Sequence, residues 1–336
     1  MELPADPGLL WPSPRTFFGA PRCEDLETLS AAVAFLGVPY DAGTLQPYIR
    51  TGQSAGPAAA RLSSYNQLDY AWPPGSSASN GSLGWFDIEA KREYLAGVTM
   101  ADCGDVAIAG AAIRQNLDRI TRAARLVAER GSLVVAVGGD HSISFPVGRG
   151  MEPLGPIDVV HFDAHADFTD HFFGARYSHG SQLRRLSELP FVRSITAIGL
   201  RNVWKVEYDD LVTYGAGIAT TRDVLESGPQ EVVELLVPEG GTLYVSIDID
   251  VLDLPIVPGT TLPEPGGLSY RDLRAALDAV ARRGRVVGFD IVELDPPHDP
   301  PAATSRVTTW LIIHFLSAIS LTAPDHHHDQ PIRNHR

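Results

Sequence analysis

The most informative segment of the sequence is IDVVHFDAHADF, residues 157–168. It opens with an apolar run of the kind that forms a strand buried on both faces of a sheet. Asp163, His165 and Asp167 then follow at every second position, and alternate residues of a strand share one face. Three such groups packed together repel one another unless a positive charge lies between them. The stretch therefore predicts a buried strand that ends in a metal site.

Five further apolar runs resemble this one and alternate with amphipathic helical patterns. This alternation predicts an α/β fold with a mostly parallel sheet covered by helices on both faces. The expected strands cover 31–40, 133–139, 157–163, 194–200, 242–250 and 286–294, and the expected helices cover about 111–130, 269–283 and 308–321. Ser269 is the expected N-cap of the second helix, and Gly131 and Gly284 are expected just past the ends of the first two.

The composition narrows the class of protein. The 336 residues are 44% hydrophobic and 20% charged, as in globular proteins. A formal charge of −14 argues against general nucleic-acid binding and against an anionic membrane surface, and it is compatible with a cationic substrate. The two cysteines, Cys23 and Cys103, suggest neither a disulfide framework nor a thiolate zinc site. With no signal peptide or apolar stretch of membrane-spanning length, a cytoplasmic protein is expected.

The chain is expected to form one domain. This domain covers residues 31–322, after an N-terminal extension over 1–30 and before a disordered tail over 323–336. The segment 71–84 is rich in Gly, Ser and Pro and predicts a surface loop. The histidines at 326–328 are interpreted as part of the tail rather than as a site.

Chemically active side chains follow four of the apolar runs. GGDHS (138–142) follows one run, Asp248 and Asp250 end another, and Asp290 and Glu293 follow a third. Each alone has an ordinary explanation as a turn, a helix cap or a surface carboxylate. Ligands of open α/β sheets bind beyond the carboxyl ends of the strands, and charged groups are rarely buried unless paired. Together with DAHAD (163–167), these groups predict a single site.

The donors at this site are two imidazoles and four carboxylates, too many for one tetrahedral zinc ion. They suit two divalent ions that share bridging carboxylates. The oxygen-rich set favours Mn²⁺, although Ni²⁺ or Co²⁺ could also occupy it. Such a pair lowers the pKa of a water between the ions into the neutral range, which indicates a hydrolase. The expected ligands are His141, Asp163, His165, Asp167, Asp248 and Asp250.

These motifs resemble those of the ureohydrolase family, which includes arginase, agmatinase and guanidinobutyrase. GGDHS, DAHAD and SIDID (246–250) are similar to the three metal motifs of that family, in the same order. Four more segments extend the likeness from about residue 30 to 320: GVPYDAGT (37–44), DCGDV (102–106), PGTTLPEPGGL (258–268) and DIVELDPPHD (290–299). The resemblance implies a three-layer sandwich around an eight-stranded parallel sheet, two Mn²⁺ ions per subunit, and a homo-oligomer, either a trimer or a hexamer.

The resemblance also implies a role for each residue. Asp163 and Asp248 would bridge the two ions. The first ion would also be held by His141 and Asp167. The second ion would also be held by His165 and Asp250. Asp167 would hydrogen-bond the bridging hydroxide as well.

Two further residues match family positions with a role in catalysis. Glu293 matches the carboxylate that pairs with the planar, cationic guanidinium group. His179, in YSHGS (177–181), matches the histidine that carries a proton to the leaving amine.

Departures from the family pattern leave the substrate open. The family's R-x-G-x-x-x-G-P loop appears as RTGQSAGP (50–57), after an unusual LQPYI. The loop FTDHFFGARYSHG (168–180) is aromatic, lacks the Asn pattern of arginase, and resembles the agmatinase and guanidinobutyrase branch. In this loop Asp170 could pair with a substrate amine and Arg176 with a substrate carboxylate, or both could be solvated charges.

The predicted protein is a hydrolase of C–N bonds in linear amidines that releases urea and an amine from a small guanidino substrate. Agmatine, 4-guanidinobutanoate or a related compound is the expected substrate. Guanidine itself, a guanidino secondary metabolite and formimidoylglutamate are alternatives. A deacetylase of related fold would hold one zinc ion with fewer carboxylates. A non-catalytic paralogue would lack some of the six ligands, and none is missing.

Overall fold

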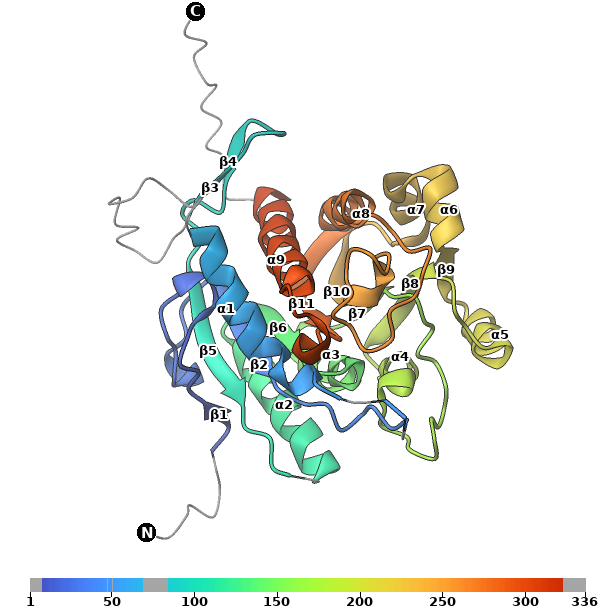
Figure 1. The fold of residues 1–336 in the computed structure, drawn as a ribbon, viewed down its shortest axis with the longest axis horizontal. Helices are drawn as coiled ribbons and strands as arrows, with labels where there is room; N and C mark the ends of the chain where they lie inside the picture. Colours follow the sequence, from blue (N-terminus) through green and yellow to red (C-terminus); the bar gives the residue numbers. More distant parts are fainter. Residues whose placement is uncertain (1–7, 47, 50, 69–83, 111, 323–336) are drawn as a thin grey trace, which may run out of the picture.

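The computed structural model in Figure 1 describes residues 8–46, 48–49, 51–68, 84–110 and 112–322. The predicted loop over 71–84, except for residue 84, and the predicted tail over 323–336 lie outside the described residues. Arg50, the first residue of the RTGQSAGP motif, also lies outside them.

A nine-stranded sheet forms the centre of the described fold, in the order β1-β5-β2-β6-β11-β10-β7-β8-β9 (Figure 1). Eight neighbouring strands are parallel, as expected, and the short β1 adds an antiparallel ninth at one edge. The strands are β1 Leu10–Trp11, β2 Val33–Val38, β5 Met100–Val106, β6 Leu133–Gly138, β7 Ile157–Phe162, β8 Val192–Leu200, β9 Gly217–Thr220, β10 Gly241–Asp248 and β11 Gly284–Val292. A separate hairpin consists of β3 Trp85–Asp87 and β4 Arg92–Tyr94.

Helices cover both faces of the sheet, so the three-layer prediction is confirmed. One face packs against α1 Gly56–Leu68, α6 Thr221–Ser227, α7 Pro229–Leu236, α8 Tyr270–Arg283 and α9 Ala303–Thr322. The other packs against α2 Ile113–Glu129, α3 Ser144–Gly150, α4 Gln182–Ser187 and α5 Lys205–Tyr214. Within the described residues, no helix combines the length and hydrophobicity needed to cross a membrane.

Strand β6 shows why the central strands are apolar throughout. Val135 and Val137 pack into the core on the α9 side, whereas Val134 and Ala136 pack into the core on the α2 side. Alternate residues of a strand point to opposite faces, so a sheet covered on both faces needs apolar residues at every position.

Three details of the sequence prediction need correction. Helix α9 begins at Ala303 rather than near 308, because Asp299 accepts hydrogen bonds from the N–H groups of Thr304 and Ser305 at its start. Gly284 directly follows α8, as expected, but its backbone is extended and it already begins β11. Two of the eight parallel strands, β5 and β9, were missed, since β9 has only four residues and β5 carries charges; the short β1, β3 and β4 were missed as well.

The charges of β5 are neutralised by one buried arginine. Arg61 of α1 donates from Nε to Asp102 Oδ2 at 2.9 Å and from Nη1 to Asp105 Oδ1 at 2.5 Å, and its side chain is fully buried. Asp102 also accepts a hydrogen bond from the N–H of Phe17 at 2.7 Å. This network attaches α1 and the N-terminal segment to the edge of the sheet. Residues 8–30, expected to be an extension, thus pack onto the fold.

Replacing Arg61 with leucine is expected to destabilise the protein by about 3–5 kcal/mol, because it leaves two carboxylates without their cation, one of them deeply buried. Urea unfolding followed by tryptophan fluorescence measures the change. Arg271→Leu is the matched control, since Arg271 pairs with Glu89 at the surface and its side chain is 82% exposed. Equal stability of the two variants would contradict the assigned role of Arg61.

Candidate metal centre

Four neighbouring strands supply the candidate site. β6, β11, β10 and β7 are adjacent and parallel, so their carboxyl ends meet at one edge of the sheet. The motif GGDHS follows β6, Glu293 follows β11, Asp248 ends β10, and Asp163 follows β7. Ligand sites of open parallel sheets lie at this edge.

A tight turn after β6 positions His141. Gly139 has a φ of +42°, and a Cβ atom there would lie 2.3 Å from the carbonyl oxygen of Tyr40. Only glycine fits such a left-handed, close-packed position. Asp140 then accepts hydrogen bonds from the N–H groups of Ser142 at 3.0 Å and Gly43 at 2.6 Å, which fixes the turn.

His141 faces three carboxylates with a single nitrogen. Its Nδ1 lies 3.1 Å from Asp163 Oδ2, 3.1 Å from Asp167 Oδ2 and 3.0 Å from Asp248 Oδ2. One ring nitrogen carries at most one hydrogen and cannot donate to all three. Both His141 Nδ1 and Asp163 Oδ2 are buried without a hydrogen-bond partner. The donor set therefore fits a cation between these four side chains.

A second group of donors shares Asp163 with the first. His165 Nδ1 lies 3.3 Å from Asp163 Oδ1 and 3.1 Å from Asp250 Oδ2. Backbone N–H groups orient the carboxylates: Asp250 donates to Asp248 Oδ1 at 2.8 Å, and Ala164 donates to Asp250 Oδ1 at 3.1 Å. The other oxygen of each carboxylate is left to face an imidazole. Asp163 thus lies where it could bridge two ions.

The pKa shifts at the site show that it is unfavourable to bury several charged carboxylates close together. Burial raises the pKa of Asp248 well above its usual value, and the nearby Asp250 and Asp163 raise it further. Burial lowers the pKa of His141, but the three neighbouring carboxylates of Asp163, Asp167 and Asp248 outweigh it and hold that pKa well above normal. Divalent cations would replace these protons, because they stabilise every carboxylate in its charged form.

Ser246 and Asp290 hold His141 through its other ring nitrogen, Nε2. His141 Nε2 lies 2.9 Å from Ser246 Oγ, and Ser246 in turn donates to Asp290 Oδ1 at 2.9 Å. With the Ser246 hydrogen committed to Asp290, Nε2 is the nitrogen that donates and Nδ1 is left as an acceptor. Asp290, which the sequence placed at the same edge, therefore orients a candidate ligand rather than facing the cavity.

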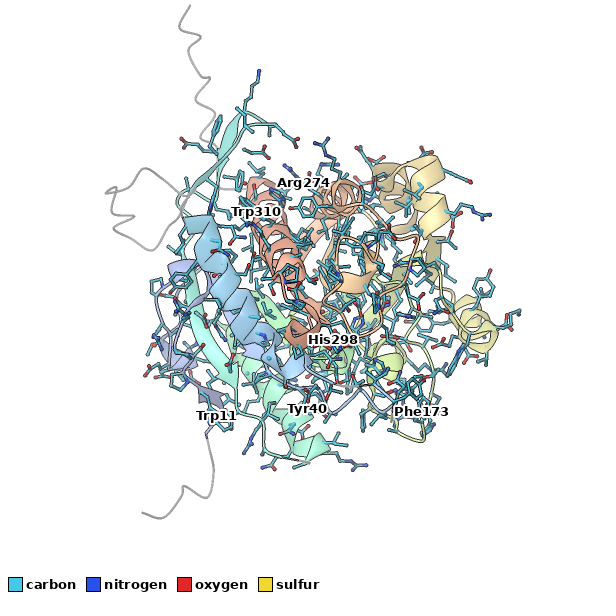
Figure 2. The ribbon with its side chains drawn as sticks, in the orientation of Figure 1. Trp11, Tyr40, Phe173, Arg274, His298 and Trp310 are labelled. Carbon is cyan, nitrogen blue, oxygen red and sulfur yellow. The ribbon has the colours of Figure 1, made fainter. Side chains whose placement is uncertain are left out.

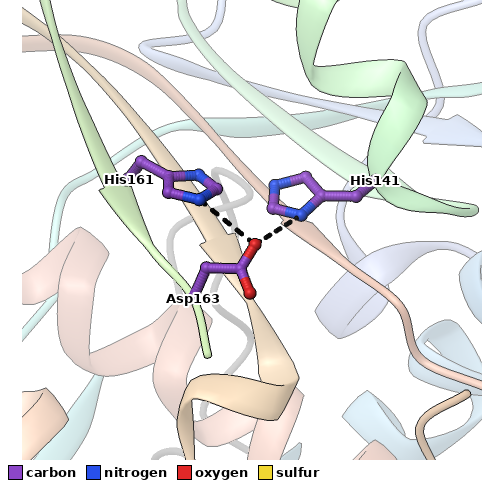
Figure 3. A group of neighbouring side chains, drawn as sticks. All are labelled: His141, His161 and Asp163. Carbon is purple, nitrogen blue, oxygen red and sulfur yellow. Dashed lines mark ion pairs between the residues drawn. The ribbon is translucent and has the colours of Figure 1, made fainter. Parts of the chain in front are cut away.

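His161 is a further candidate ligand, which was not predicted from the sequence. This residue lies inside β7, with Nε2 3.1 Å from Asp163 Oδ2 and its ring stacked 5.1 Å from that of His141 (Figure 3). His161, Asp163 and His141 offer ligand atoms close enough together to hold an ion. The signal was present, because His161 extends the period of two that Asp163 and His165 continue.

Glu293 is held beside the cluster by several donors. Its Oε1 accepts from the N–H of His141 at 2.7 Å, and its Oε2 accepts from Gln53 Nε2 at 3.0 Å. Burial raises the pKa of Glu293, but the nearby imidazole of His179 and the hydrogen bond from Gln53 outweigh it, so the pKa stays below its usual value. Glu293 has a φ of +65° and Asp167 a φ of +48°. Left-handed backbone at non-glycine residues is typical of functional sites.

His179 lies across the cavity from the cluster. Its Nε2 is 3.0 Å from Gln46 Oε1 and its Nδ1 is 3.8 Å from Glu293 Oε1. Burial lowers the pKa of His179, but Glu293 outweighs this and raises it above its usual value. Nothing in the sequence marked Gln46 or Gln53 as neighbours of these residues.

A cavity of about 250 Å³ leads to the candidate centre. Phe172 and Trp204 form one wall, with their rings stacked 5.7 Å apart, and Phe173 projects beside them from the loop after β7 (Figure 2). Glu264 and Glu207 also line the cavity, and burial raises the pKa of Glu207 to about 7. Among the lining residues that the structure describes there is no lysine or arginine.

Asp170 and Arg176 do not line this cavity. Arg176 Nη1 donates to Asp170 Oδ1 at 3.1 Å, and the buried Arg185 donates to the same oxygen at 2.7 Å. Arg176 also pairs with Glu188 at 2.6 Å. The two side chains are thus paired within their own loop, an arrangement that does not favour the substrate contacts suggested for them.

Comparison with known proteins agrees with this geometry. The model of the arginase family matches residues 31–317. The chain belongs to the arginase family. Guanidinopropionase from Pseudomonas aeruginosa is a relative of the chain, 32% identical over 320 residues that cover 92% of each protein.

Two solved structures share the fold of this chain. Proclavaminate amidino hydrolase from Streptomyces clavuligerus has a TM-score of 0.78 at 26% identity, covering 93% of this chain and 98% of its own. Agmatine ureohydrolase from Thermoplasma volcanium has a TM-score of 0.74 at 27% identity, covering 92% and 95%. The chain is therefore an arginase-family amidinohydrolase, a hydrolase of C–N bonds in amidines.

Proposed function

We propose that this protein holds two divalent metal ions and hydrolyses a guanidino C–N bond to release urea and an amine. The observation that carries the proposal is His141 Nδ1, a buried nitrogen without a hydrogen-bond partner that faces three carboxylates. One ion would be held by His141, Asp163, Asp167 and Asp248, and the other by Asp163, His165, Asp248 and Asp250. Mn²⁺ suits this oxygen-rich set, and Ni²⁺ or Co²⁺ could replace it.

The metal pair, when bound, supplies a water of lowered pKa at the base of the cavity. Glu293 pairs with two N–H groups of the guanidinium and holds its carbon over the cluster, because a planar cation fits a carboxylate in this way. Asp167, on the cavity wall, accepts a hydrogen bond from the attacking water. His179 lies close to Glu293 and gives its proton to the leaving amine.

The outer cavity favours a substrate that carries a positive charge at its far end, which is the end opposite the guanidino group. Its described walls combine the Phe172–Trp204 pair with the carboxylates of Glu264 and Glu207. Aromatic faces and carboxylates attract cations, whereas a substrate carboxylate would lie near the carboxylate of Glu264 with no lysine or arginine among the described lining residues to pair with it. We therefore propose agmatine, whose far end is an amine, ahead of 4-guanidinobutanoate and formimidoylglutamate, which end in carboxylates.

Urea release from a panel of substrates tests both parts of this proposal. The panel contains agmatine, 4-guanidinobutanoate, 3-guanidinopropanoate, arginine and guanidine, each assayed with Mn²⁺ and with Ni²⁺. Agmatine is expected to have the highest kcat/KM, by about tenfold or more, since an aromatic and carboxylate contact to a cation contributes roughly 1–2 kcal/mol. If no substrate of the panel releases urea, the proposed reaction is refuted. If a guanidino acid is turned over faster than agmatine, only the proposal that the substrate has a cationic far end is refuted.

A further inference from the structure

The two cysteines of the chain lie side by side at the edge of the sheet. Arg22 and Asp102 form a parallel β-bridge, in which the N–H of Asp102 donates to Pro21 and the N–H of Cys23 donates to Asp102, both at 2.9 Å. In a parallel bridge the next residues of the two segments are also neighbours, and their side chains leave the same face. The register therefore places Cys23 beside Cys103.

The side chains of these cysteines pack into the same core: Cys103 belongs to the core on the α2 side of the sheet, and Cys23 packs against it. Burial raises the pKa of Cys103, and the neighbouring Cys23 raises it further. Cys103 is 3% exposed and Cys23 is partly exposed. Both line a cavity of about 220 Å³, together with Arg22 and Glu24, so a small molecule can approach Cys23 from that side. Neighbouring strand residues have the Cα separation that a disulfide spans.

We propose that Cys23 and Cys103 are a redox modification site that forms an intramolecular disulfide with a peroxide oxidant. The Cys23 thiol loses its proton, and the thiolate attacks hydrogen peroxide and breaks the O–O bond; Cys23 becomes a sulfenic acid, and the departing hydroxide takes up that proton and leaves as water. The Cys103 sulfur then attacks the Cys23 sulfur, the S–O bond breaks, and the hydroxyl leaves as water with the Cys103 proton. Two thiols are oxidised by two electrons, and one peroxide is reduced to two waters.

The disulfide would fasten the N-terminal segment to β5. Cys103 follows Asp102, the carboxylate that binds Arg61 and the N–H of Phe17. A covalent bond here closes a long loop of chain and restricts the unfolded state, so oxidation is expected to raise the Tm. A thiol reductant restores both cysteines by exchange, which makes the modification reversible.

The test uses the full chain, reduced and then freed of reductant, and treated in native buffer with a small excess of hydrogen peroxide. After denaturation and alkylation, mass spectrometry is expected to show a loss of about 2 Da, no alkylated cysteine and a cross-linked Cys23–Cys103 peptide. Dithiothreitol is expected to return both alkylatable thiols, and the oxidised chain is expected to melt at a higher temperature than the reduced one.

Single-cysteine variants distinguish this disulfide from simple oxidation. In Cys23→Ser, Cys103 is expected to remain alkylatable after the same treatment, because it is buried. In Cys103→Ala, Cys23 is expected to gain oxygen, because no second thiol resolves its sulfenic acid. The proposal is overturned if the unaltered chain keeps both thiols, if Cys23 gains oxygen while Cys103 stays free, or if the disulfide joins two chains. An unchanged Tm after complete oxidation would overturn the proposed fastening of the N-terminal segment.

Discussion

Asp163→Ala is expected to lower urea release by roughly 10³-fold or more, because bound metal contributes several kcal/mol to the transition state and each 1.36 kcal/mol is a factor of ten. Asp163 is the carboxylate whose two oxygens face both His141 and His165, at 3.1 and 3.3 Å. Its loss removes a ligand from both proposed ions at once. Urea assays together with metal analysis of the purified protein measure the effect, with two ions per subunit expected before the change and fewer than one after it.

The folded state is expected to survive this substitution. Removal of Asp163 relieves its repulsion with Asp248 and Asp250, which offsets the loss of its pairing with the neighbouring histidines in the metal-free protein. Circular dichroism and the Tm of the chelated protein check this point. His171→Ala is a control within the same loop, because His171 is half exposed and lies outside the cavity. Undiminished turnover in the Asp163 variant would remove the basis for the proposed centre.

Glu293→Gln is expected to lower kcat/KM for guanidino substrates by about 30- to several-thousand-fold while the metal content stays near two ions per subunit. Glu293 is buried, remains ionised and has no place in either proposed ligand set. Glutamine keeps the shape and one acceptor oxygen but loses the charge that pairs with guanidinium. Breaking a buried, charged hydrogen bond costs about 2–5 kcal/mol, which gives the expected range.

Two measurements separate this role from a structural one. Metal analysis of Glu293→Gln shows whether the cluster is intact, and the Tm shows whether the fold is. Glu188→Gln makes the same chemical change outside the cavity and is expected to leave kcat/KM unchanged. Loss of metal from the Glu293 variant, with normal kinetics in the fraction that retains it, would contradict the assignment to the guanidinium group.

Much of the fold was predictable because its signals are local. Strands buried on both faces must be apolar at every position, and all six predicted strands appear in the described residues. The missed strand β5 breaks this rule, since Asp102 and Asp105 occupy buried or half-buried positions. Arg61, far away in the sequence, neutralises them, and no local pattern shows that pairing.

The candidate site was predictable in its donors but not in its surroundings. All six predicted donors converge in the structure, because each follows or ends a parallel strand. The neighbours that orient or complete the site were not singled out by the sequence: Gln53 and Ser246 lie inside quoted motifs without an expected role, and Gln46, Trp204 and Glu207 come from segments outside the quoted motifs. Conversely, Asp170 and Arg176 stood close to the motifs but pair with each other outside the cavity.

The sequence by itself determined which side chains end the strands, and therefore the chemistry available at one edge of the sheet. Only the tertiary structure decided that β6, β11, β10 and β7 are neighbours, that Ser246 and Asp290 stand behind His141, and that His161 lies against Asp163. The reason is that the burial of a strand and its period of two can be recognised from residues that are adjacent in the sequence. Strand order and side-chain pairing instead depend on contacts between segments that are distant along the chain.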